Sequence, residues 1–185
     1  MTTATETLLT AEEYRLLPDN GQPTELIRGR VVELNMPAPR HGYFCNKIGR
    51  ILGNFVEEHD LGRVMSNDSG VITHRGPDTV RGADVCYYSY TRLPKGPLPE
   101  GYLPVTPELV FEVRSPTDRW SHVIAKVGEY LNAAVLVVCV LDPQTETLTV
   151  YHADEIQRIL TEDDELSLPE LLGPDFRVPV RRFFE

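Results

Sequence analysis

The 185-residue sequence lacks the features that would mark a membrane or secreted protein. No run approaches the ~18–20 consecutive apolar residues that a membrane-spanning helix needs. The segment before Tyr14 has no basic region followed by an apolar core, as a secretory signal would have. The sequence therefore predicts a cytoplasmic protein without a membrane partner.

Cysteine is scarce, and several catalytic motifs are absent. The three thiols, Cys45, Cys86 and Cys139, lie far apart and form no C-x-x-C pair, so neither a disulfide framework nor a zinc knuckle is predicted. We interpret all three as buried or half-buried. No Cys–His pair, glycine-rich phosphate loop or G-x-S-x-G elbow is recognised, which disfavours acyl transfer and nucleotide hydrolysis by a P-loop.

Basic residues are outnumbered, with 18 Lys and Arg against 28 Asp and Glu and a net charge of −10. Such a balance argues against a nucleic-acid partner, because phosphate binding depends on basic surface. From residue 142 to 185, however, eleven acids and four bases give −7 and leave −3 for the first 141 residues. The acidity is mainly C-terminal. It predicts weak non-specific DNA binding without excluding DNA.

The patterning that is present predicts one α/β domain over residues 1–185. A capping box from Thr10 to Glu13 predicts a helix to about Leu17. Apolar spacing predicts helices over 41–58 and from Pro116 to about Asn132. The proline-rich segment 91–107 should be irregular. Alternating or apolar runs predict a mixed sheet flanked by the helices, with strands at 25–27, 30–34, 63–66, 70–74, 83–88, 108–114, 135–141 and 147–152.

Two carboxylates, Asp84 and Glu112, lie within apolar strands. A carboxylate desolvated alone costs several kcal/mol, so each should be ion-paired, hydrogen-bonded or metal-bound. A structural ion pair, or an edge strand with one wet face, stays open as the alternative. Glu112 and Arg114 share one strand face and lie near the carboxyl end of the strand, where open α/β sheets place ligands.

Lys126 lies in the following helix and shares a helical face with Tyr130 at i+4. If this helix packs beside the strand end, its ammonium approaches the two carboxylates. Two acids and a lysine would form a divalent-metal site with a group that orients or deprotonates water.

These residues, taken in order, resemble the signature of the Uma-type restriction endonuclease family, within the PD-(D/E)XK nuclease superfamily. No single motif is specific, but the ordered set covers most of the chain. It comprises LTAEEY at 9–14, ELIRGRVV at 25–32, PRHG at 39–42, Asp84, EVRSP at 112–116, Lys126, Tyr130 and LDP at 141–143.

The resemblance implies a restriction-endonuclease-like core that hydrolyses DNA phosphodiester bonds with Mg²⁺ or Mn²⁺. By its pattern Asp84 and Glu112 would ligate the metal, and Glu25 would act as an auxiliary acid. The catalytic lysine, which many of these nucleases carry two residues after the glutamate, would be Lys126. Its ammonium is expected either to lose its proton through burial or to stay charged and support the water.

The same resemblance places His41, Arg114 and Tyr130 at the substrate. Arg114 stands at the older lysine position, but a guanidinium stays protonated and cannot act as a general base. His41 has the alternative of a helix-start residue with a hydrogen-bonded ring.

The chain departs from the family pattern at several positions: Ala83 replaces a proline, His122 an aspartate, and 134–139 a more polar segment. A second hypothesis is therefore a catalytically inactive nuclease-fold protein with a binding or assembly role, and a third is a phosphodiesterase acting on RNA. Cutting both strands of a duplex with one site per chain would favour a two-fold homodimer.

Overall fold

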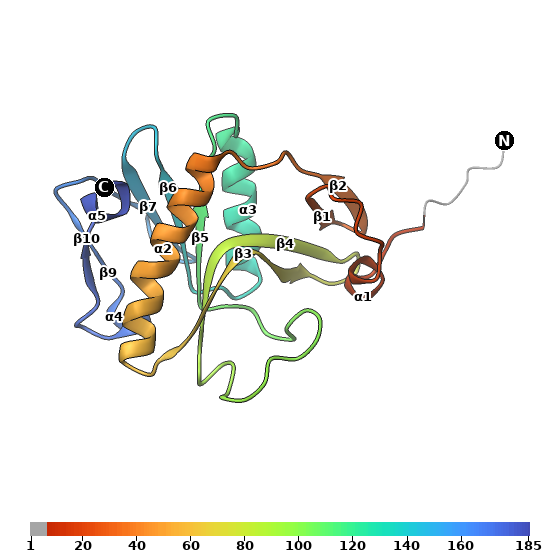
Figure 1. The fold of residues 1–185 in the computed structure, drawn as a ribbon, viewed down its shortest axis with the longest axis horizontal. Helices are drawn as coiled ribbons and strands as arrows, with labels where there is room; N and C mark the ends of the chain where they lie inside the picture. The colour runs from red at the N-terminus through yellow and green to blue at the C-terminus, as the bar shows by residue number, and fades with distance from the viewer. Residues whose placement is uncertain (1–6) are drawn as a thin grey trace.

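The computed structural model describes residues 7–185, so the first six residues of the expected domain lie outside it (Figure 1). Within residues 7–185 the main feature is an eight-stranded mixed sheet in the order β2-β1-β4-β5-β6-β7-β8, with β3 also paired to β4. Its strands are β1 (Thr24–Ile27), β2 (Arg30–Glu33), β3 (Gly62–His74), β4 (Thr79–Ser89), β5 (Leu109–Val113), β6 (Val137–Asp142), β7 (Thr147–His152) and β8 (Arg158–Leu160).

β5 and β6 are the parallel pair of this sheet, and the other pairings are antiparallel. Parallel neighbours need a crossover, which the helix α3 (Trp120–Asn132) supplies. Every residue of β5 and β6 is buried, as their mainly apolar sequences predict for strands covered on both faces. The strands predicted at 25–27 and 30–34 form the antiparallel hairpin β1–β2, and those predicted at 135–141 and 147–152 form the hairpin β6–β7.

Helices cover both faces of the sheet (Figure 1). The long helix α2 (Pro39–Glu58) packs Phe44, Ile48 and Leu52 into one core with Phe111 of β5. On the other face, α3 packs Val127 and Tyr130 into a second core with β5 and β6. Alternate side chains of β5 thus face different helices, and the predicted α/β architecture with a mixed sheet flanked by helices is confirmed.

Two predicted elements have different limits in the structure. The helix expected from Pro116 begins at Trp120, because the Asp118 carboxylate accepts the Ser115 N–H (2.8 Å) and holds that segment as a turn. The two strands expected at 63–66 and 70–74 are one strand, β3, whose register against β4 shifts between Ser66 and Ser69. The short first helix, α1 (Ala11–Arg15), has the predicted capping box and ends earlier than expected.

The C-terminal segment, for which only an acidic character and a short apolar finish were expected, packs against α2. Its Leu166, Phe176 and Phe183 are buried in the α2 core. The segment between β4 and β5 loops out without helix or strand, as its prolines predict (Figure 1). None of the described helices is long and apolar enough to span a membrane. The remaining elements are β9 (Glu165–Ser167), α4 (Pro169–Leu172), β10 (Arg177–Pro179) and α5 (Arg181–Phe184).

Candidate active site

The end of the β4–β5 pairing brings Asp84 and Glu112 together. The last paired residues are Val85 and Phe111, and one more step in this register sets Asp84 opposite Glu112. Opposite residues of an antiparallel pair have Cβ atoms roughly 4.5–5.5 Å apart. At this point the Val113 N–H donates to Asp84 Oδ2 (2.6 Å), so a side-chain carboxylate replaces a backbone acceptor. Two carboxylates therefore end the same strand pair.

Glu112 is buried beneath α3, and its carboxylate has two partners there. Lys126 Nζ donates to Oε2 (2.8 Å) and the Tyr130 hydroxyl donates to Oε1 (2.9 Å). Burial raises the pKa of Glu112 to about 8 and the Asp84 charge adds to the rise, although Lys126 opposes it. In the absence of a further cation, Glu112 is therefore largely protonated at neutral pH. A cation bound beside Glu112 would therefore favour the charged form of its carboxyl group.

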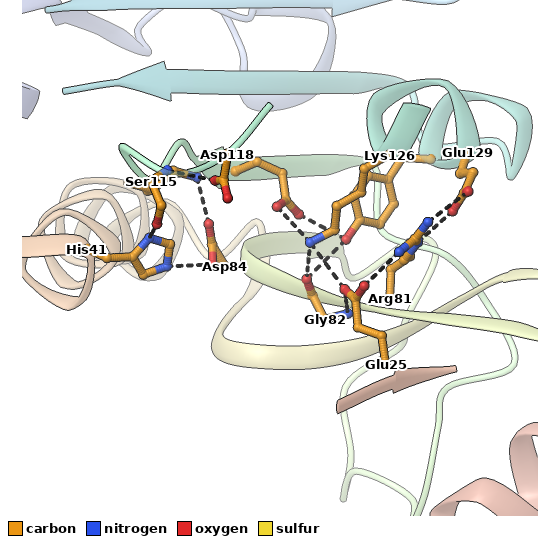
Figure 2. A network of polar contacts seen from close by, with 12 residues as sticks. Glu25, His41, Arg81, Gly82, Asp84, Ser115, Asp118, Lys126 and Glu129 are labelled. Atoms are coloured by element: carbon orange, nitrogen blue, oxygen red, sulfur yellow. Dashed lines mark hydrogen bonds and ion pairs between the residues drawn. The ribbon is translucent and has the colours of Figure 1, made fainter. Parts of the chain in front are cut away.

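Lys126 joins three elements (Figure 2). Besides Glu112, its ammonium contacts the Gly82 carbonyl (2.8 Å) on β4 and Glu25 Oε1 (3.3 Å) on β1. Burial opposes the charge of Lys126, but Glu112 and Glu25 together hold its pKa above the ordinary value. The sequence left two roles open for this lysine, and the geometry favours the charged one.

Glu25 is held in place by backbone and by a half-buried arginine. It accepts the Gly82 N–H (3.0 Å) and a hydrogen bond from Arg81 (2.7 Å). Arg81 also makes a two-point contact with Glu129 of α3 (2.6 and 2.9 Å; Figure 2). Although burial opposes ionisation, Lys126 and Arg81 lower the pKa of Glu25. Sequence reasoning missed Arg81 and Glu129; the available signal was a charged residue inside the apolar strand β4.

His41 lies in the first turn of α2 and faces Asp84. Its Nε2 is 3.0 Å from Asp84 Oδ1, while Nδ1 is 3.4 Å from the Ser115 hydroxyl (Figure 2). The hydrogen bond with Asp84, more than any other contact, raises the pKa of His41 to about 11. A hydrogen-bonded ring at the helix start is the alternative that the sequence predicts for His41, and the ring is indeed hydrogen-bonded. Its cationic edge faces Asp84 in the site.

Cys45, one helical turn after His41, lies beside the same ring. Donor atoms of His41, Cys45 and Asp84 all fall within 4.8 Å of one another, a group that could hold a metal ion. The sequence interpretation that no Cys–His pair exists is therefore wrong. The two residues are neighbours because they stand at i and i+4 on one helix face.

A further carboxylate, Asp68, was not singled out from sequence. It lies at the register shift of β3 and has a positive φ of 53°. The strands approach closely here: a Cβ added at Gly82 would lie 3.0 Å from Asp68 Cβ. Burial and the neighbouring Asp84 raise the pKa of Asp68. The only sequence signal is the polar run 66–70 within an otherwise regular strand.

Two side chains expected to contact the substrate, Tyr130 and Arg114, already bind other groups of the protein. Tyr130 is fully buried and its hydroxyl donates to Glu112 (2.9 Å), so the predicted contact with substrate stays a prediction. The Arg114 guanidinium, on the predicted face of β5, pairs with Asp142 (2.8 Å) and lies over the Trp120 ring (5.0 Å). Its role at the substrate stays a prediction.

Comparisons with known proteins identify the family and the fold of the chain. The Uma2 family model, described as "Putative restriction endonuclease", matches residues 11–181. Among solved structures, the chain is similar to a putative nuclease of the DUF820 family from Anabaena variabilis. The two share 17% sequence identity at a TM-score of 0.80, over 95% of this chain and 97% of that one. No curated protein matches the chain significantly. The structural likeness confirms the predicted restriction-endonuclease-like fold.

Proposed function

The chain belongs to the Uma2 family of putative restriction endonucleases, and on this premise we propose that it is a metal-dependent nuclease that hydrolyses DNA phosphodiester bonds. The observation that carries the proposal is the environment of Glu112. A buried carboxylate with a pKa raised to about 8 stands at the strand end opposite Asp84 and contacts a charged lysine. A structural ion pair alone does not require the second carboxylate.

The residues present fit a hard divalent cation. Asp84 and Glu112 offer carboxylate oxygens, the ligands that Mg²⁺ and Mn²⁺ prefer. We propose that these two residues hold the ion and that its charge offsets the burial and the Asp84 repulsion that raise the pKa of Glu112. When bound, such an ion polarises a phosphoryl oxygen and acidifies water.

The other side chains keep the reacting groups in place. Lys126, held by Glu112, Glu25 and the Gly82 carbonyl, keeps its proton, and its positive charge supports a nucleophilic water or a phosphate oxygen electrostatically. Preorganised charge of this kind lowers the barrier because it needs no rearrangement during the reaction. Glu25 holds Lys126, and Tyr130 orients Glu112 from the protein side.

His41 supplies a second cation at the edge of the site. Its raised pKa keeps the imidazolium charged at neutral pH, and we propose that it contacts a phosphate of the substrate backbone. The low net charge of residues 1–141 is compatible with DNA, and weak non-specific affinity is expected. We also propose that the protein is a two-fold homodimer and is cytoplasmic. Both proposals rest on the sequence alone.

Cleavage of supercoiled plasmid with Mg²⁺ or Mn²⁺ tests the proposal. Lys126→Ala and Asp84→Asn should each lower the rate by about 10²-fold or more, the magnitude typical of removing one preorganised donor or ligand. Lys95→Ala is the matched control, because Lys95 is an exposed lysine that pairs with exposed Asp60 and lies over the Tyr90 ring, and none of these residues belongs to the site. Cleavage that is equal in wild type and Lys126→Ala would remove Lys126 from the mechanism.

A catalytically inactive binding protein is the second candidate, and one observation favours it. Lys126 Nζ already lies 2.8 Å from Glu112 Oε2 without any added ion, as it would in a purely structural contact. Metal titration distinguishes the two functions. A nuclease should be thermally stabilised by Mg²⁺ or Mn²⁺, and this stabilisation should disappear in Asp84→Asn. The inactive protein should show no such stabilisation. A phosphodiesterase acting on RNA would cleave an RNA substrate in the same assay and leave plasmid intact.

A further inference from the structure

Cys45 has no part in the function proposed above, yet it contacts the site. It is half-buried on α2, whereas Cys86 and Cys139 are fully buried. His41 and Cys45 project from one face of α2, and Asp84 faces them from β4. Because the three donor atoms lie within 4.8 Å of one another, one ion can contact all three after small side-chain adjustments.

The donor set differs in kind from the carboxylates beside it. Mg²⁺ selects oxygen, whereas thiolate and imidazole select Zn²⁺ and related ions. One sulfur, one ring nitrogen and one carboxylate oxygen form a three-ligand set of the kind that leaves a fourth position open. Tetrahedral Zn²⁺ with bonds of about 2.0–2.3 Å keeps its donor atoms roughly 3.3–3.8 Å apart. His41 Nε2 and Asp84 Oδ1, at 3.0 Å, are already close to that spacing.

The surroundings support a cation at this point. The Asp68 carboxyl group lies next to Asp84 on the β3 side, where a bound cation would favour its charged form. The Ser115 hydroxyl faces His41 Nδ1 at 3.4 Å, so the ring can keep a partner on one nitrogen while the other binds an ion. Such outer contacts are the usual means of orienting a ligating histidine.

We propose that His41, Cys45 and Asp84 form a second cation site that binds Zn²⁺ and similar thiophilic ions. Binding displaces the protons of the thiol and the ring nitrogen into solvent and leaves both groups as ligands. The site shares Asp84 with the proposed Mg²⁺ site, so the two ions compete for this carboxylate. Zn²⁺ should therefore inhibit cleavage, a consequence that rests on the proposed function, whereas the binding itself does not.

Titration with Co²⁺, a spectroscopic substitute for Zn²⁺, tests the site without DNA. Wild type at fixed pH should develop a thiolate-to-cobalt charge-transfer band that saturates at one equivalent. The band should disappear in Cys45→Ser and persist in Cys139→Ala, the matched control with a thiol buried elsewhere. Added Zn²⁺ should abolish the band, whereas Mg²⁺ at the same concentration should not.

No band in wild type, or a band retained in Cys45→Ser, would overturn the proposal. Circular dichroism establishes whether each variant folds. Should Cys45→Ser not fold, His41→Asn keeps the thiol and should weaken Co²⁺ binding at least tenfold, and unchanged affinity would overturn the proposal equally. Because the readout is an absorption band, a protein that binds Co²⁺ but cuts no plasmid refutes the nuclease and leaves this site standing.

Discussion

Metal binding at Asp84 and Glu112 should release a proton and tighten as the pH rises. The pKa of Glu112 in the metal-free protein is about 8, so its carboxyl group is protonated through most of the neutral range. Only the carboxylate ligates a metal, and the proton therefore competes with the ion below that pKa. Each pH unit below the pKa should weaken apparent binding about tenfold, or about 1.4 kcal/mol.

The magnitude follows from the ionised fraction of Glu112. About 1% of the carboxyl groups are ionised at pH 6, about 10% at pH 7 and half at pH 8, if the pKa is 8. The apparent affinity for Mn²⁺ should thus rise about 50-fold between pH 6 and pH 8 and level off above pH 9. At pH 7 about 0.9 proton should be released per ion.

Isothermal titration calorimetry in buffers of different ionisation enthalpy measures both quantities. The matched control is Glu108→Gln, which changes a buried carboxylate of the same sheet that binds Ser89 instead of the site and should leave the pH profile unchanged. A flat affinity between pH 6 and 8 would refute the reasoning. A slope that continues above pH 9 would assign the released proton to His41, whose pKa is about 11, and would refute the assignment to Glu112.

Further predictions concern the groups that hold the site. Tyr130→Phe removes the hydroxyl that donates to Glu112 and should weaken Mn²⁺ binding about threefold to tenfold at pH 7, measured by the same calorimetry, since a hydrogen bond contributes about 0.5–1.5 kcal/mol. Arg81→Met leaves Glu25 and Glu129 without their shared cation and should lower the free energy of unfolding in urea by about 3–5 kcal/mol. Lys95→Met, at an exposed ion pair with Asp60, should cost far less, and equal losses in the two variants would contradict the burial argument.

Elements with strong local patterns could be predicted from the sequence. The apolar spacing of α2, the hairpin β1–β2 and the apolar strands β5 and β6 each carry their signal within a short window, and all four form as expected. The pairing of Asp84 with Glu112 was not visible in this way. It depends on the register between two strands separated by a long irregular segment, and the sequence indicated it only through the two carboxylates in apolar strands and the order of motifs in the resembled family.

The residues missed from sequence share a physical reason. Asp68 reaches the site because β3 shifts register, and a shift of one or two residues changes which side chains face the site. Arg81 is recognisable as a bridge only once β1 and α3 are both placed around β4. For Cys45, the spacing from His41 was present in the sequence, but its meaning depends on Asp84 facing that turn of α2.

The fold also explains why the lysine beside Glu112 comes from a helix. Arg114 stands two residues after Glu112 on the same face of β5, but the parallel register sets Val113 beside Leu141, and Asp142 is therefore near Arg114. The guanidinium binds this carboxylate and ties the ends of β5 and β6 together. Because α3 crosses the same face of β5, Lys126 can supply the ammonium from above, one turn before Tyr130. Arg114 can thus stabilise the strand ends while Lys126 supplies the positive charge beside Glu112.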